Sequence, residues 1–231
     1  MKVLTVVLTC SQTQDQADSC RKTWLRKIPE QDWFFYGDTR QSLAMENTWD
    51  CSPDEGEHRK RLPEKTYKML NRSLSYDWDF LFKCDDDSYV VFDRVTDLLK
   101  GQNKNKNLYL GKSQFQKGVQ FAQGGAGYVL GRESVEKSIK EFKKFYKDVD
   151  LTRRAEDYSV GLSLGSWRYP HLMPAGKTLG NKLTHCEEFS TPTKQNAEKN
   201  QNICIDAIKN GKATTHYVEP NTMKKIYDIF K

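Results

Sequence analysis

The sequence lacks the features that mark fibrous, membrane-spanning and thiolate-metal proteins. Only 14 glycines and seven prolines occur in 231 residues, which excludes a collagen-like or low-complexity chain. No stretch approaches the roughly 18 consecutive apolar residues of a membrane-spanning helix, so we expect no transmembrane segment. The six cysteines include no C-x-x-C pair, which argues against a zinc or redox site built from thiolates.

The cysteines that are present can pair or stay free. An even count allows full pairing, and spacing alone does not choose among the connectivities. Cys84 lies inside an apolar strand pattern, so we expect it to be a buried free thiol. Cys186 and Cys204 are the pair that we would test first for a disulfide bond.

Large apolar side chains are frequent enough for one well-packed domain. Hydrophobic residues make up 37% of the chain and aromatic residues 12%, which excludes a disordered protein. A length of 231 residues fits one domain better than two. We therefore expect a single domain over residues 1–231.

Positive charge exceeds negative charge only slightly. The chain has 37 Lys and Arg against 31 Asp and Glu, a formal net charge of +6. Much of the excess lies in separate segments, 102–106, 137–147 and 224–231, without the interleaved aromatics that favour nucleic-acid binding. We therefore expect a solvated lysine surface and no nucleic-acid partner, although a phosphate-bearing small molecule would also suit this charge.

Short apolar strands alternate with amphipathic helices along most of the chain. The β-branched start at residues 3–8 indicates a buried strand rather than a secretion signal, because no small-residue cleavage site follows it. Strands are predicted at residues 3–8, 33–36, 78–84, 109–111, 128–130 and near 215–218, and helices at 14–25, 57–75, 92–99, 132–145, 155–164 and 222–230. This alternation predicts an α/β fold with a mostly parallel central sheet.

Three consecutive aspartates follow the apolar strand 78–84. Like charges this close repel one another unless a cation neutralises them, and Mg²⁺ and Mn²⁺ bind such oxygen ligands. On an extended path Asp85 and Asp87 point to one side and Asp86 to the other, so the outer pair can share one metal ion. A surface acidic turn, or caps for the helix at 92–99, is the alternative. The apolar strand favours a ligand site, because open α/β sheets bind ligands at strand carboxyl ends.

Three further features are ambiguous on their own. The glycine cluster 124–127 allows close approach of a ligand, but structural turns use glycines equally often. Glu156 and Asp157 stand where a helix begins and could simply cap its free N–H groups. His216 follows a short strand start, and a lone histidine is more often structural than catalytic.

Taken together and in order, these segments resemble a known family. The matching segments are 3–8, 21–24, 78–90, 109–112, 124–130, 156–161, 216–218 and 222–223. The series Asp-Asp-Asp, Gly-Gly-Ala-Gly and Glu-Asp-x-x-x-Gly in this spacing is highly specific. The chain thus resembles the fringe and core 1 β1,3-galactosyltransferase group, the inverting β1,3-glycosyltransferases of family 31. Residues 177–212 depart from the resemblance, because this lysine- and asparagine-rich segment aligns with no part of it.

The resemblance implies a GT-A glycosyltransferase fold with a single Rossmann-like nucleotide-binding domain. It places a donor-binding part at about residues 1–112 and an acceptor and catalytic part at about 113–231. It also implies a UDP-sugar donor, Mn²⁺ (or Mg²⁺) as cofactor, and a glycan or glycoprotein acceptor whose hydroxyl receives a hexose or N-acetylhexosamine in a β1,3 linkage. The sequence leaves the particular sugar open.

The resemblance also carries roles onto individual residues. Asp85 and Asp87 match the metal motif, with Asp87 the first candidate for a direct ligand and Asp85 nearer the ribose. His216 matches the histidine that completes the metal site in the core 1 enzymes. His185 is the alternative, because the metal histidine lies earlier in fringe-like members.

Other positions match catalytic and nucleotide-binding residues. Asp157 matches the catalytic base, and Glu156 is expected to help orient it. The residues expected to contact the nucleotide sugar are Asp85, Asp86, Thr9, Arg21, Lys65, Gly124, Gly125 and Ala126.

Two readings outside the transferases stay open. One is a catalytically inactive nucleotide- or glycan-binding protein, and the other is a metal-dependent nucleotide-sugar hydrolase. The family is usually anchored in the Golgi lumen. If the chain is native and complete, we expect a cytoplasmic protein of viral or microbial origin, and otherwise a Golgi-lumenal catalytic domain trimmed of its anchor.

Overall fold

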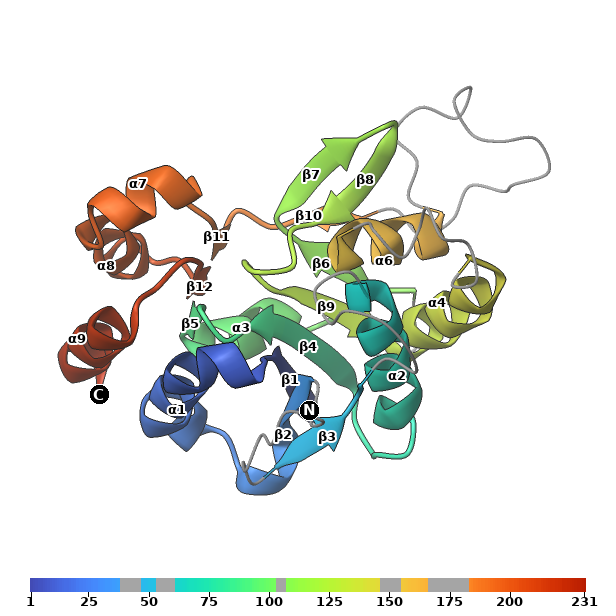
Figure 1. Cartoon of the computed structure of the whole chain (residues 1–231), viewed down its shortest axis with the longest axis horizontal. Coiled ribbons are helices and arrows are strands. Elements are labelled where there is room, and N and C mark those ends of the chain that lie inside the picture. The colour runs from blue at the N-terminus through green and yellow to red at the C-terminus, as the bar shows by residue number, and fades with distance from the viewer. Residues whose placement is uncertain (38–46, 53–60, 103–106, 146–154, 166–182) are drawn as a thin grey trace.

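The computed structural model of the protein describes residues 1–37, 47–52, 61–102, 107–145, 155–165 and 183–231 (Figure 1). Within these ranges, helices and strands alternate, as the sequence predicts. No helix in the described part of the chain is both long and apolar enough to cross a membrane.

A seven-stranded sheet forms the centre of the described structure. The order of its strands is β10 (Thr184–His185), β6 (Tyr109–Gly111), β9 (Tyr128–Gly131), β4 (Phe80–Asp85), β1 (Val3–Leu8), β2 (Trp33–Gly37) and β3 (Thr48–Asp50). Neighbouring strands run parallel except where β9 pairs antiparallel with β4 and β6. The expected α/β fold with a mostly parallel sheet is confirmed.

Helices cover both faces of this sheet (Figure 1). One face packs under α1 (Gln14–Lys22), α3 (Phe92–Leu99), α8 (Asn202–Lys209) and α9 (Pro220–Phe230), together with the short α7 (Lys194–Lys199). The other face packs under α2 (Leu62–Ser73), α4 (Arg132–Phe145) and α6 (Glu156–Leu164). The strands therefore carry apolar side chains on both sides, as expected for a buried parallel sheet.

Strand β4 shows how one strand serves both faces. Phe80, Phe82 and Cys84 pack into the core under α1 and α3, whereas Leu81 packs into the core under α2 and α4. This alternation is the two-residue period of an extended chain. Lys83 lies two residues after Leu81 and therefore points to the same face of β4.

Two small sheets stand beside the large one. Strand β5 (Tyr89–Val90) pairs antiparallel with β12 (Thr214–Thr215), which pairs parallel with β11 (Phe189–Ser190). Strands β7 (Ser113–Gln116) and β8 (Val119–Ala122) form an antiparallel hairpin. The pairing of β5 with β12 brings the segment behind the three aspartates next to the segment before His216.

Several element boundaries differ from expectation. The helix expected at 14–25 ends at Lys22, and a separate 3₁₀ turn, Trp24–Lys27, follows it. The described part of the helix expected at 57–75 begins at Leu62, which puts Pro63 in the first turn, where a proline needs no N–H partner. Residues 53–60 lie outside the described ranges. The strand expected near 215–218 is Thr214–Thr215.

The structure answers which cysteines pair: the candidate disulfide between Cys186 and Cys204 does not form. Cys186 and Cys204 are both free in the structure, as are the other four cysteines. Cys186 Sγ donates to Glu188 Oε2 at 3.1 Å, and Cys204 Sγ donates to the His216 carbonyl at 3.6 Å. Each thiol therefore has its own local acceptor. Cys84 is a buried free thiol, as predicted.

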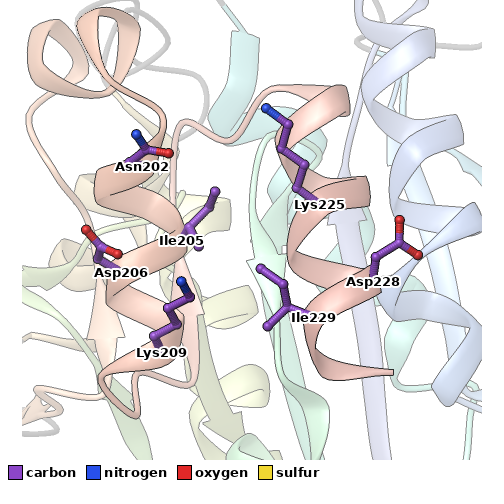
Figure 2. A pocket seen from close by; sticks show the side chains of 7 residues that line it. All are labelled: Asn202, Ile205, Asp206, Lys209, Lys225, Asp228 and Ile229. Atoms are coloured by element: carbon purple, nitrogen blue, oxygen red, sulfur yellow. The ribbon is translucent and has the colours of Figure 1, made fainter.

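A surface groove of about 540 Å³ lies between α8 and α9 (Figure 2). Its lining combines Ile205 and Ile229 with two lysines and two aspartates. This mixture of apolar, positive and negative side chains does not favour one ligand chemistry. None of the lining residues belongs to the cluster described next.

Candidate active site

The three aspartates occupy the end of β4 and the turn that follows. The Asp86 N–H continues the β1 pairing by donating to the Leu8 carbonyl at 3.1 Å, and Ser88 N–H closes the turn on Asp85. The carboxylates therefore lie at the carboxyl end of a central strand. Open α/β sheets bind ligands at this end of their strands.

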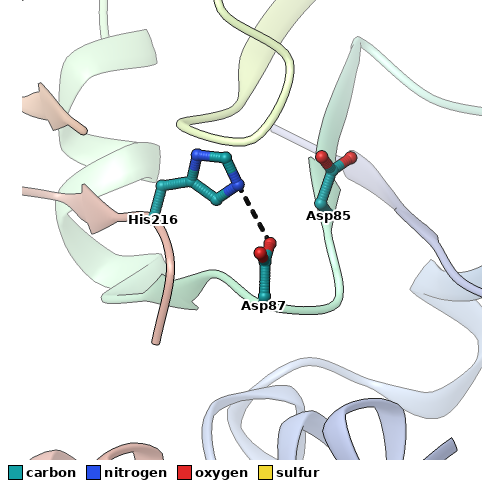
Figure 3. Close-up of side chains that lie close together, drawn as sticks. All are labelled: Asp85, Asp87 and His216. Carbon is teal, nitrogen blue, oxygen red and sulfur yellow. Dashed lines mark ion pairs between the residues drawn. The ribbon is translucent and has the colours of Figure 1, made fainter. Parts of the chain in front are cut away.

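Asp85, Asp87 and His216 form one cluster, the Asp–His cluster (Figure 3). Each offers a ligand atom, and these atoms lie within 4.8 Å of one another. His216 Nε2 lies 3.0 Å from Asp87 Oδ1. Two carboxylates and one imidazole make a donor set that suits Mn²⁺ or Mg²⁺, so the residues present fit a divalent metal ion.

Backbone pairing places His216 beside the aspartates. Thr215 pairs with Tyr89 across β12 and β5, and the Val218 N–H donates to the Asp87 carbonyl at 2.8 Å. The imidazole stacks on the Tyr217 ring, with centroids 3.7 Å apart. Backbone pairing on either side of His216, at Thr215 and at Val218, therefore holds the histidine beside Asp87.

Gly125 packs directly against the imidazole of His216. A Cβ at position 125 would overlap the ring atoms Cε1, Nε2 and Nδ1. The carbonyl of Gly125 accepts a hydrogen bond from Ser88 Oγ at 2.5 Å, which ties this backbone to the aspartate turn. The close approach explains why glycine is required here.

Gly125→Ala is expected to displace the His216 ring and to weaken divalent-metal affinity about 10- to 100-fold, the range seen when a group that orients a ligand is lost. Metal titration followed by isothermal calorimetry measures this directly. Gly101→Ala is the control for strain away from the site: a Cβ there would meet nothing within 4 Å, but alanine is strained at its φ of +80°. Metal affinity per folded molecule should stay unchanged in this variant. Equal affinities in both variants would contradict the assigned contact.

His185 lies outside the Asp–His cluster. Its ring is exposed, with Nδ1 2.8 Å from Ser113 Oγ and Nε2 2.5 Å from Glu187 Oε1. Glu187 also pairs with Lys112 at 2.8 Å. The geometry therefore favours His216 over His185 as a partner of the two aspartates.

Asp86 points away from the cluster, as the extended path predicts. Its Oδ2 accepts hydrogen bonds from Thr9 Oγ1 at 2.7 Å and from Thr13 Oγ1 at 2.5 Å. Burial raises the pKa of this carboxyl to about 7, although both hydroxyls oppose the rise. The expected nucleotide contacts Thr9 and Asp86 therefore lie against each other at the start of α1.

Arg21 and Lys65 come from different faces of the sheet. The half-buried guanidinium of Arg21, on α1, lies 5.9 Å from the centroid of the Phe35 ring. Lys65 is buried in α2. Neither side chain belongs to the Asp–His cluster, and their contact with a nucleotide stays a prediction.

Asp157 lies in the first turn of α6 and is oriented by two backbone groups. Its Oδ2 accepts from Gly124 N–H at 3.0 Å, and its Oδ1 accepts from Tyr158 N–H at 2.7 Å. Burial raises the pKa of Asp157 above its ordinary value, while the Gly124 hydrogen bond and the charge of Lys83 oppose the rise. The carboxylate therefore does part of the capping expected at a helix start and is also made more basic.

Glu156 is buried and caps nothing. Its Oε1 pairs with Lys83 Nζ, and its Oε2 accepts from Tyr128 Oη at 3.1 Å and from Thr66 Oγ1 at 3.4 Å. Burial raises its pKa to about 7. Lys83 Nζ also lies 2.7 Å from Asp85 Oδ1. Sequence reasoning missed Lys83, although its spacing of two from Asp85 on a strand was a usable signal.

The glycine cluster connects these groups. Gly124 donates to Asp157, Gly125 packs on His216, and the buried Ala126 accepts at its carbonyl from Thr214 Oγ1 at 2.6 Å. Gly127 adopts a left-handed φ of 90°, which favours glycine. One short turn therefore touches the proposed base, the histidine and strand β12.

Solved structures with the same architecture are glycosyltransferases. The galactosyltransferase LgtC in complex with donor and acceptor sugar analogs has a TM-score of 0.54 and 11% identity, and the match covers 99% of this chain and 96% of that one. A glycosyltransferase involved in the glycosylation of the major capsid of PBCV-1 has a TM-score of 0.60 and 10% identity, with coverage of 99% and 100%. The chain therefore has the GT-A glycosyltransferase fold.

The sequence comparisons define the family. The family model described as Fringe-like matches residues 2–167, and the chain belongs to that family. Relatives include glycoprotein-N-acetylgalactosamine 3-beta-galactosyltransferase 1 of Xenopus laevis, 32% identical over 46% of this chain, and fringe glycosyltransferase of Drosophila melanogaster, 29% identical over 61% of this chain. The matches span 30% and 39% of those two relatives. The expected family and its GT-A fold are confirmed.

Proposed function

We propose that the protein is an inverting glycosyltransferase that moves a hexose or N-acetylhexosamine from a UDP-sugar to a hydroxyl of a glycan or glycoprotein, forming a β1,3 linkage with Mn²⁺ (or Mg²⁺) as cofactor. The observation that supports it best is the glycine turn. This turn places the oriented carboxylate of Asp157 beside Gly124 and the Asp–His cluster beside Gly125. A base and a metal site thus flank one short backbone segment.

On the acceptor side, Asp157 is the proposed base. Two N–H groups fix its carboxylate, and burial makes it a stronger proton acceptor. It takes the proton of the acceptor hydroxyl as that oxygen bonds to C1 of the sugar, and the bond from C1 to the diphosphate oxygen breaks at the same time. This single displacement inverts the anomeric centre and releases UDP.

On the donor side, Asp85, Asp87 and His216 would hold the metal ion. When bound, the ion supplies neutralisation of the charge that develops on the departing diphosphate. Asp86, Thr9, Arg21 and Lys65 are proposed to bind the nucleoside, and Gly124, Gly125 and Ala126 to face the sugar. We propose that residues up to about 112 bind the donor and that residues beyond 112 bind the acceptor. His216 is an exception, because it lies in the acceptor part and would bind the metal ion on the donor side.

The state of the cysteines bears on the compartment. All six cysteines are free thiols in the structure, and free thiols are usual in reducing compartments. The two settings that the sequence allows, the cytoplasm and the Golgi lumen, both stay part of the proposal.

A panel of UDP-sugars tests the proposal. With Mn²⁺ and no acceptor, slow release of UDP is expected from one preferred donor, and a chelator should abolish it. Release of the sugar phosphate instead of UDP would favour the nucleotide-sugar hydrolase. If no UDP-sugar in the panel gives UDP release while the protein still binds nucleotide, the result would favour the catalytically inactive binding protein.

A further inference from the structure

Lys83 is a buried lysine that pairs with carboxylates from two separate elements. Its side chain is 0% exposed, and its Nζ pairs with Asp85 Oδ1 at 2.7 Å and with Glu156 Oε1. Asp85 ends β4 and belongs to the Asp–His cluster, whereas Glu156 begins α6 next to Asp157. One ammonium group therefore contacts both halves of the proposed site.

The surroundings of Lys83 are otherwise those of an apolar core position. Leu81 precedes it on the same face of β4, and the Tyr128 ring centroid lies 5.6 Å from its Nζ. An ammonium group buried here must recover its lost hydration from its partners, and an apolar residue would often serve stability as well. Packing alone gives no reason for a charge at this position, whereas the two carboxylates do.

A further feature places Lys83 near the proposed base. Its Nζ lies 3.1 Å from the position that a Cβ on Gly124 would take, so the ammonium group occupies the space beside this glycine. The N–H of Gly124 donates to Asp157 Oδ2. The lysine therefore lies next to the backbone segment that orients Asp157.

We propose that Lys83 is a positioning residue that holds the metal-side carboxylate Asp85 and the base-side residues Glu156 and Gly124 in fixed register, so that Asp157 is aligned with the bound donor. The inference rests on the proposed function. Without Lys83, Glu156 would keep only hydroxyl donors, from Tyr128 and Thr66. A buried carboxylate in that state either takes up a proton or relocates toward water. Both changes end its ion pair with β4 and free the turn of α6 that carries Asp157.

Lys83→Met keeps the unbranched shape and most of the length of the side chain and removes the charged nitrogen. We expect kcat at saturating donor and Mn²⁺ to fall about 100-fold, because misplacement of about 1 Å acts on the chemical step. The Kd of UDP in the presence of Mn²⁺ should weaken by no more than about 10-fold, the lower end of the range seen when a group that orients a metal ligand is lost. Steady-state kinetics and a nucleotide titration separate the two. Lys100→Met is the control, since it removes an exposed ion pair with Asp97 on α3, and both constants should be unchanged.

A double variant provides a second readout that structural loss alone would not move. Glu156→Gln should lower kcat in the unmodified protein but raise it in the Lys83→Met background, because the unpaired buried carboxylate is then removed. The kcat values are measured per folded molecule, with the folded fraction taken from thermal unfolding. If Lys83→Met does not fold, the double variant is compared with Glu156→Gln alone. A further loss of about tenfold in kcat is expected from the missing contact with Asp85 and from the space left beside Gly124.

Three outcomes would overturn the proposal. The first is a folded Lys83→Met protein whose kcat is normal. The second is a double variant whose loss in kcat equals the product of the two single-variant losses. The third is a double variant whose kcat equals that of Glu156→Gln alone. Each of these leaves the proposed function standing when the unmodified protein releases UDP. Absence of UDP release from the unmodified protein would overturn the proposed function, and this inference with it.

Discussion

Asp157→Asn is expected to lower kcat by about 10²–10⁴-fold, the usual contribution of a general base, while UDP-sugar binding is retained. Asparagine keeps one oxygen, which can accept from the Gly124 N–H, but its NH₂ group cannot accept from the Tyr158 N–H. One of the two backbone anchors is therefore kept. Asparagine cannot take a proton from the acceptor. Initial-rate kinetics with a saturating donor and an equilibrium titration of that donor measure the two effects.

The pH dependence gives an independent check on Asp157. Because burial raises its pKa, the unmodified protein should lose kcat/KM as the pH falls through that raised value, where the base becomes protonated. The Asn variant should lose the part of this decline that belongs to Asp157, while the carboxyls of Glu156 and Asp86, each with a pKa of about 7, still titrate. Asp97→Asn on α3, an exposed aspartate paired with Lys100, is the matched control. Near-normal turnover in Asp157→Asn would assign the base to another residue.

Asp87→Ala is expected to weaken metal-dependent donor binding by more than about 100-fold, beyond the range seen for groups that only orient a metal ligand. Asp87 is the carboxylate that meets the imidazole of His216, at 3.0 Å, so its loss removes one of three converging donors. The measurement is a UDP titration with and without Mn²⁺. The difference between the two should be large in the unmodified protein and absent in the variant.

Histidine variants decide between the two candidates. His216→Ala should reproduce most of the loss seen in Asp87→Ala, because it removes a ligand from the same cluster. His185→Ala serves as the control, since its ring contacts Ser113 and Glu187 instead. The opposite pattern, with the Mn²⁺ effect lost only in His185→Ala, would move the metal site toward β10.

Much of the fold could be predicted because its strands and helices carry strong local patterns. The strand Val3–Leu8 and the helices Phe92–Leu99 and Arg132–Phe145 have the predicted bounds, since an apolar run or a 3.6-residue period defines each of them. The β7–β8 hairpin was missed. Three of the four residues of β7 are exposed, and Phe115 is the one apolar residue among them, so no alternating pattern indicates a strand. The one local signal is the turn at Lys117 and Gly118, where both residues have positive φ.

Helices α7 and α8 were missed for a similar reason. Residues 177–212 read as polar and irregular, yet Thr193 caps α7 by accepting from Asn196 N–H, and Cys204 and Ile208 form one buried side of α8. The sequence therefore contains a helix-capping threonine, and after it two apolar residues, Cys204 and Ile208, at the four-residue spacing of a helix. Short helices in a lysine-rich segment give too weak a period to stand out.

The site was predictable where residues adjoin in sequence. The opposite directions of Asp86 and its two neighbours follow from the extended chain, and the structure shows them. The pairing of Lys83 with Glu156 was not predictable, because it depends on how α6 packs across β4. Tertiary packing, rather than any local pattern, decides such a contact.

The pairing of β5 with β12 also bears on the order in which the site comes into being. During synthesis the strands β1, β2, β4 and β9 emerge long before β12, so a nascent chain can assemble its parallel sheet while the histidine of the Asp–His cluster is still missing. A cation bound there joins the middle of the chain to a segment near residue 216. Because it binds only the folded form, it would favour that form by mass action and act as a late cross-link of the C-terminal helices to the sheet.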